Sequence, residues 1–109
     1  MIKIIFVERY AMLSADDFAK IGFWEDTTPE ENITIYGMDF EHTYVTLTDA
    51  DGKTPVEPKK AIIMAAYDDA SCFLWFREFK SFGELEQVCA QAEAESEELF
   101  KLFEEKSAQ

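Results

Sequence analysis

The chain has 109 residues, 48% of them apolar and 15% aromatic, which is typical of one globular domain whose core needs no metal or disulfide. Its 23 acidic and 10 basic residues give a formal charge of −13 at pH 7. This charge argues against binding to nucleic acid or anionic membranes, and the aromatic content argues against a disordered acidic chain. We predict a single cytoplasmic domain over residues 1–109, without a secretory signal or a bilayer-spanning run of roughly 18 apolar residues.

The first third of the chain predicts a strand and a short helix. Residues 2–10 carry β-branched and apolar side chains on both faces, which is typical of a strand covered on both sides. Ser14 followed by Asp17 predicts the start of a short helix, because the hydroxyl and the acid can satisfy the first N–H groups. Gly22 closes this helix. Residues 28–31, Thr-Pro-Glu-Glu, predict one further helical turn.

The middle of the chain predicts strands joined by tight turns. The predicted strands span residues 33–36, 43–48, 61–67 and 72–79. Gly37 is expected to end or bulge the first of them. Residues 49–52, Asp-Ala-Asp-Gly, predict a turn, and residues 68–71 predict the turn of a hairpin.

The last quarter predicts a long amphipathic helix that begins with a capping box at Ser81 and Glu84 and runs to about Glu105. On a helical wheel its apolar side chains share a sector of about 120°. They are Phe82, Leu85, Val88, Cys89, Ala92, Leu99, Phe100 and Phe103. The predicted fold is therefore α+β: a mostly antiparallel sheet of about five strands, a short N-terminal helix, and the long C-terminal helix packed on the sheet.

Acidic residues are concentrated in this predicted helix. Residues 82–109 hold eight acids and two bases, whereas residues 55–81 hold four of each. Four carboxylates share a sector of about 40° on the wheel, and Glu98 lies farther round. The four are Glu86, Glu93, Glu97 and Glu104. Spaced about 6 to 10 Å apart along a rigid helix, they approximate the spacing of backbone phosphates and fit a groove lined with Lys and Arg. The alternative is a solvated face that keeps the protein soluble.

Bulky side chains on the last predicted strand give a second candidate surface. Phe73 and Trp75 are expected on one face of the sheet. Leu74 and Phe76 then point to the opposite face. With a helix on one side only, the other face would be an exposed apolar patch, and hence an interface for a second copy or another protein. The alternative is that the first helix and residues 23–24 cover this face.

No arrangement of residues indicates a catalytic or metal site. The single histidine, His42, and the separated Cys72 and Cys89 form no catalytic or zinc-binding pattern. The turn at residues 49–52 lacks the acids that a calcium loop needs at its first and last positions. We therefore predict a protein that is not an enzyme and that needs no metal or cofactor. The two cysteines are expected to be reduced core thiols, with a disulfide as the alternative.

These features predict a non-catalytic protein that binds a basic protein partner, such as a nucleic-acid-handling enzyme, by occupying its basic channel. The partner-binding carboxylates would be Glu86, Glu93, Glu97, Glu98 and Glu104. In size, acidity and absence of a catalytic motif, the chain resembles small phage and mobile-element inhibitors, which include DNA mimics and anti-CRISPR proteins. One alternative is a structural or accessory subunit that assembles through Phe73, Trp75 and Phe76, as a homodimer or a hetero-complex. Another is a small-molecule sensor or enzyme with a pocket between sheet and helix.

Overall fold

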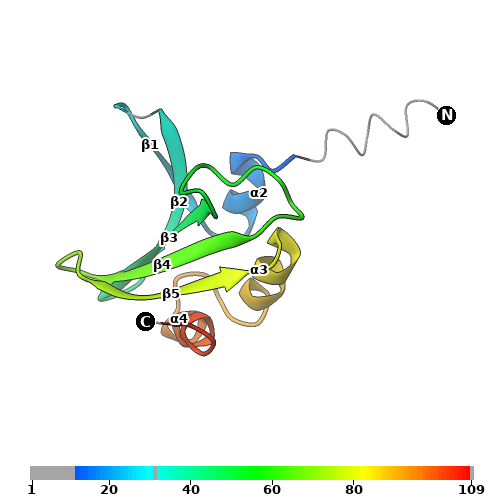
Figure 1. Ribbon diagram of the computed structural model, residues 1–109. Helices are drawn as coiled ribbons and strands as arrows, with labels where there is room; N and C mark the ends of the chain where they lie inside the picture. The colour runs from blue at the N-terminus through cyan, green and yellow to red at the C-terminus, as the bar shows by residue number, and fades with distance from the viewer. Residues whose placement is uncertain (1–11, 31, 109) are drawn as a thin grey trace, which may run out of the picture.

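The computed structural model describes residues 12–30 and 32–108, which form five strands and three helices (Figure 1). The helices are α2 (Ala15–Lys20), α3 (Phe82–Cys89) and α4 (Glu97–Glu104). The strands are β1 (Trp24–Thr28), β2 (Ile33–Asp39), β3 (Thr43–Asp49), β4 (Ile62–Asp68) and β5 (Phe73–Phe79). The strand predicted over residues 2–10 lies outside the described residues.

The strands form one antiparallel sheet in the order β1-β2-β3-β4-β5, so neighbours in space are also neighbours in sequence. Aspartates shape two of its turns. The Asp49 carboxylate accepts hydrogen bonds from the N–H groups of Asp51 and Lys53, at 2.8 Å each. The Asp68 carboxylate accepts two more at the β4–β5 hairpin, from Ala70 and Cys72 at 2.9 Å. The α+β class and the four predicted strands from residue 33 to residue 79 are confirmed, but β2 continues through Gly37 to Asp39, so the expected end or bulge at Gly37 is wrong.

The sheet also contains β1, an edge strand that the sequence analysis did not predict. Thr28 ends this strand and pairs with Ile33 across the hairpin, and the hydroxyls of Thr27 and Thr34 meet at 2.9 Å. Thr28, where a helical turn was expected, instead belongs to β1, which is joined to β2 by a hairpin. The hairpin is closed by a hydrogen bond of 2.7 Å from the N–H of Asn32 to the carbonyl of Thr28.

The short helix α2 begins and ends where the sequence predicts. The N–H of Ser14 donates to the Asp17 carboxylate at 2.9 Å, as a capping box requires. Gly22 follows the last turn with a φ of 96°, a left-handed conformation that favours glycine, and its N–H donates to the Ala19 carbonyl at 3.0 Å.

The prediction of one long C-terminal helix is wrong, because seven residues separate α3 from α4. Glu95 has a φ of 69°, and the Ser96 hydroxyl accepts a hydrogen bond of 3.1 Å from the N–H of Leu99, which begins a new helix. A straight helix over residues 82–105 would be about 36 Å long, whereas a strand the length of β5 spans about 23 Å. The break lets both parts of the apolar stripe pack on the sheet.

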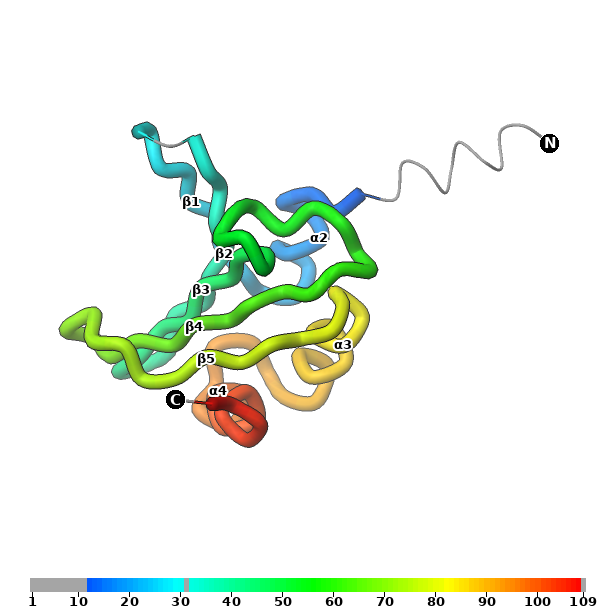
Figure 2. Tube along the Cα trace, viewed as in Figure 1, coloured from blue at the N-terminus to red at the C-terminus, as the bar shows by residue number. Residues whose placement is uncertain are grey.

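The core lies between the three helices and one face of the sheet, which we call the helix face. Phe18 of α2 stacks on Tyr36, with ring centroids 4.0 Å apart, and Phe100 of α4 packs against Trp75 at 5.5 Å. Figure 2 shows α3 and α4 beside β5, while the β1–β2 hairpin projects away from them. We call the opposite side of the sheet the open face, because none of the described helices packs on it.

Candidate functional site

The five predicted partner-binding carboxylates form an exposed set that we call the acidic layer. Glu86 lies on α3, Glu93 lies between the helices, and Glu97, Glu98 and Glu104 lie on α4. All five are exposed. Because the helix is broken, they do not form the expected single row along one rigid helix axis.

The acidic layer has no ion-pair partner within the described part of the chain. An ion pair there joins Lys60 to Glu57, and the His42 ring lies 3.8 Å from the Glu41 carboxylate and 3.7 Å from that of Asp69. Glu97 and Glu98 lie in the first turn of α4, where the helix dipole stabilises negative charge. Glu104 lies at the opposite end of the same helix, where the dipole disfavours it. A positive partner would stabilise Glu104.

The acidic layer also lacks exposed apolar side chains that could anchor a partner. The large apolar residues of α3 and α4, such as Phe82, Phe100 and Phe103, are buried in the core. The exposed large apolar residues in the described ranges are Met12, Val56, Phe73 and Phe76. None belongs to α3 or α4. Tight interfaces concentrate their energy in such anchors, so the layer by itself supports attraction and orientation by charge.

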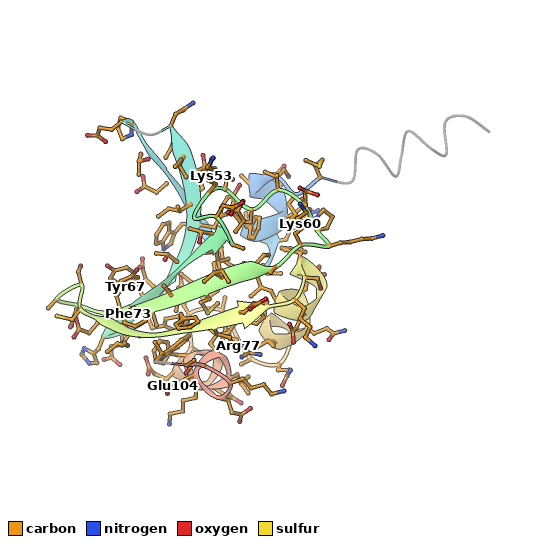
Figure 3. The ribbon with its side chains drawn as sticks, in the orientation of Figure 1. Lys53, Lys60, Tyr67, Phe73, Arg77 and Glu104 are labelled. Atoms are coloured by element: carbon orange, nitrogen blue, oxygen red, sulfur yellow. The ribbon has the colours of Figure 1, made fainter. Side chains whose placement is uncertain are left out.

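Arg77 neutralises the end of α4 from inside the fold, a role that the sequence reading missed. The residue is 5% exposed, and its guanidinium donates to the carbonyls of Leu102 and Phe103, at 2.9 and 3.1 Å. Figure 3 shows it directed from β5 toward α4. Burial lowers the pKa of Arg77, and the nearby carboxylates of Glu84 and Glu105 oppose that change. The alternation of β5 is the signal that places this cation on the helix face.

A bulge in β5 rearranges the second candidate surface. Ala66 pairs with Trp75, but the next residue, Tyr67, pairs with Phe73, so Leu74 is passed over. Simple alternation placed Phe73 and Trp75 on the same face. The extra residue moves Phe73 to the face of Tyr67, which is the open face.

The three predicted aromatic contact residues are therefore divided between the two faces. Phe73 and Phe76 lie on the open face, 52% and 41% exposed. Trp75 is 2% exposed and packs against Phe100 in the core, so it is not accessible to a partner. The backbone of Phe76 is held by two hydrogen bonds with Ala108, of 2.9 and 2.7 Å.

Three aromatic rings lie side by side at one end of the open face. Tyr44 stacks on Tyr67 with ring centroids 5.2 Å apart, and Phe73 meets Tyr67 edge-on at 6.1 Å. The Tyr44 and Ser71 hydroxyls are 3.1 Å apart, which joins the row to the β4–β5 turn. In Figure 3, Tyr67 and Phe73 lie near this turn. We call these three rings the aromatic row.

The sequence analysis allowed for the first helix and residues 23–24 to cover this face, but they leave most of the open face uncovered. α2 packs on the helix face, where Phe18 contacts Tyr36 and Phe82. Trp24 does lie on the open face, but it occupies the space above Gly37, where a side chain would otherwise stand. The aromatic row begins two residues beyond Gly37, where Asp39 of β2 pairs with Tyr44, and in it Phe73 is exposed while Tyr44 and Tyr67 are half-buried.

A groove of about 390 Å³ lies between α2 and α3. It is lined by Ala19, Lys20, Ile21, Gly22, Glu86, Cys89, Ala90 and Ala94. Lys20 and Glu86 are its charged side chains, and within residues 12–30 and 32–108 no three potential ligands gather to hold a metal ion. Substrate sites place several polar groups toward one point, which this lining does not do.

The two thiols are expected to differ strongly in reactivity. Burial, together with Glu86, raises the pKa of Cys89 to about 12, whereas Cys72 is exposed beside β5. At about pH 8 the Cys89 side chain is therefore almost entirely the unreactive thiol. A thiol-reactive chromogenic disulfide should label one cysteine of the native protein quickly, and Cys72→Ser should abolish that fast phase. Fast labelling that persists in Cys72→Ser would contradict the burial of Cys89.

The raised pKa of Cys89 also makes the stability of the fold depend on pH. Because the folded state disfavours the Cys89 thiolate, the free energy of unfolding should fall as the pH rises above the ordinary thiol pKa of about 8.5. At pH values below the ordinary thiol pKa, the protonated Cys89 thiol makes its full contribution to stability. Cys89→Ala should remove this part of the alkaline loss.

No family model matches the chain, and no curated protein or solved structure matches it significantly. No helix among the described residues is long and apolar enough to cross a bilayer. Function is therefore inferred from the chemistry of the two candidate surfaces.

Proposed function

We propose that this protein is a non-catalytic binding module for a basic protein. In its most specific form it would inhibit a nucleic-acid-handling enzyme by occupying that enzyme's basic channel. The observation that carries this proposal is the acidic layer, whose five exposed carboxylates have no ion-pair partner among the described residues. A channel lined with Lys and Arg supplies the opposite charge. The resemblance to small acidic phage and mobile-element inhibitors, including anti-CRISPR proteins, agrees with this partner.

Charge of this size acts before contact is made. A net charge of −13 produces a negative potential that attracts a basic surface and raises the rate of encounter. Salt screens exposed charges beyond about 8 to 10 Å at physiological ionic strength. Association through the acidic layer should therefore weaken as salt increases, mainly through slower association.

The test compares two variants that lose equal charge at different places. The layer variant carries Glu86→Gln, Glu93→Gln, Glu97→Gln, Glu98→Gln and Glu104→Gln. The control variant carries Asp16→Asn, Glu25→Gln, Glu30→Gln, Asp51→Asn and Glu57→Gln, all exposed positions outside the layer. Each variant removes five negative charges from a net charge of −13. A difference between them therefore reports the position of the charge and not its amount.

Wild-type and both variants would be used to capture proteins from a nuclease-treated host lysate, with elution in salt steps and mass spectrometry of each step. We expect basic nucleic-acid enzymes to leave the wild-type and control proteins at moderate salt. Their recovery on the layer variant should fall by about tenfold, because the carboxylates that face the partner are gone. Equal recovery on the layer and control variants would reject the acidic layer as the binding surface.

A second candidate function is assembly as a structural or accessory subunit through the open face. The exposure of Phe73 and Phe76 on a face without helices favours it. Assembly driven by apolar contact resists salt, unlike binding through the acidic layer. A salt-resistant oligomer that dissociates in Phe73→Glu would support this function over the first.

A further inference from the structure

The open face combines exposed aromatic rings with acidic side chains. Asp26, Asp39 and Glu78 project from the strands to this face, and all three are exposed. Arg77 is the one basic residue in the five described strands, and it points into the core. The strands therefore present carboxylates and aromatic rings on this face without a cation to neutralise them.

The register places one of these carboxylates in line with the aromatic row. Asp39 pairs with Tyr44, Tyr44 pairs with Tyr67, and Tyr67 pairs with Phe73. One line across β2, β3, β4 and β5 thus holds a carboxylate followed by three rings. Neighbouring strands lie about 4.8 Å apart, so the line is about 14 Å long. That length matches a short extended segment of another protein.

The hydrogen bonds of this end of the sheet hold the line in place. The Tyr44 hydroxyl contacts that of Ser71 at 3.1 Å, and Asp68 fixes the turn that carries Ser71 through two hydrogen bonds of 2.9 Å. A binding surface that is ordered before contact loses less entropy on association. The aromatic row therefore suits docking without rearrangement.

Charge decides between the two kinds of protein that could cover this face. A second copy would bring a net charge of −13 against an equal charge, with the carboxylates of both open faces close together. A positively charged segment would instead be attracted by the carboxylates of the open face. The planar guanidinium of arginine stacks on aromatic faces and pairs with carboxylates in the same contact, which a lysine ammonium does less well.

We propose that the open face docks an arginine-bearing segment of a partner protein, whose guanidinium groups stack on the aromatic row and pair with Asp39. Apolar side chains of the same segment would pack on Phe76. This inference rests on the proposed function, because it assumes a basic partner. It adds a contact surface on the side of the sheet opposite to the acidic layer, with the apolar anchors that the layer lacks.

The test measures binding of a short fluorescein-labelled peptide of alternating arginine and leucine by fluorescence anisotropy. The face variant carries Phe73→Ala and Phe76→Ala, and its control carries Met12→Ala and Val56→Ala, which are exposed apolar residues off this face. All three proteins have the same charge. We expect the face variant to bind the peptide at least about tenfold more weakly, and the control to bind it as the wild-type does. Equal binding by all three proteins would overturn the inference.

A second pair of variants keeps the test valid if the alanine changes disturb the sheet. Asp39→Asn should weaken binding of the peptide, and should weaken it more than Glu25→Gln, which removes the same charge. A peptide of alternating lysine and leucine should bind the wild-type more weakly than the arginine peptide. Equal binding of the two peptides would argue against guanidinium stacking.

The outcomes separate this inference from the proposed function. Loss of the peptide only in the layer variant would overturn the inference and leave the proposed function standing. Loss only in the face variant would support the inference, and the acidic layer would then be judged by the recovery of partners on the layer and control variants. Self-association of the wild-type at high salt, abolished in the face variant, would assign the face to a second copy and overturn the inference.

Discussion

Replacing Trp75 with alanine should lower the free energy of unfolding by about 3 to 5 kcal/mol. The Trp75 side chain is 2% exposed and packs against Phe100 of α4, so its loss leaves a cavity between sheet and helix. Domains of this kind have a total stability of about 5 to 15 kcal/mol, so the variant should be largely destabilised. Urea unfolding followed by circular dichroism would measure the loss.

Phe73 supplies the matched control, because it lies two residues away in the same strand. Its ring is 52% exposed on the open face, so Phe73→Ala should change the free energy of unfolding by less than about 1 kcal/mol. Equal losses for Trp75→Ala and Phe73→Ala would contradict the bulge that places the two rings on opposite faces. The contrast also shows that a Trp75 variant would report on folding and not on partner binding.

Gly37→Val should destabilise the protein by about 3 kcal/mol, although valine is a good strand residue. A side chain at this position would enter the space held by the Trp24 ring, which lies across the hairpin in register with Gly37. The valine side chain would therefore displace either the Trp24 ring or the backbone at position 37. Thermal or urea unfolding of the variant would measure the effect.

The cause can be isolated with a double-mutant cycle. If the Trp24 ring is the obstacle, Gly37→Val should cost less by about 1 to 3 kcal/mol in a Trp24→Ala background, where the space is empty. The alternative is that valine disturbs the strand itself. In that case the cost would be the same in both backgrounds, and the position of Trp24 over Gly37 would be rejected.

Much of the fold follows from local patterns in the sequence. In the predicted strand over residues 43–48, the alternating Val45 and Leu47 are buried in the core, and the aspartate at the start of each turn binds the N–H groups that follow it. Ser14 and Gly22 bound α2 as expected. In each case a few neighbouring residues determine the geometry, so no knowledge of distant contacts is required.

The errors occur where distant contacts decide the structure. β1 is acidic and short, and it forms because it pairs with β2 along its whole length. The long helix breaks near Glu95 because its two parts must pack on a sheet shorter than the unbroken helix. Ser96 followed by Glu97 is a helix-start pattern that marks this break. It was hidden by the absence of Gly and Pro and by the continuous helical periodicity.

The candidate surfaces were predicted in part. Exposure of the acidic layer follows from composition, since carboxylates are seldom buried. The bulge that sends Phe73 to the open face cannot be predicted from alternation, because the register shift between Ala66 and Tyr67 depends on two strands together. The alignment of Asp39 with the aromatic row depends on pairing across four strands, so the sequence pattern carries no sign of it.

Binding of a basic partner by charge is tested most directly by the salt dependence of affinity. The dissociation constant for the captured enzyme would be measured for wild-type, layer and control proteins from about 0.05 M to about 0.5 M NaCl. The wild-type and control proteins should lose at least about tenfold in affinity over this range, and the layer variant should bind weakly and change little. An affinity that is independent of salt, or equal for the layer and control variants, would show that the acidic layer does not bind the partner.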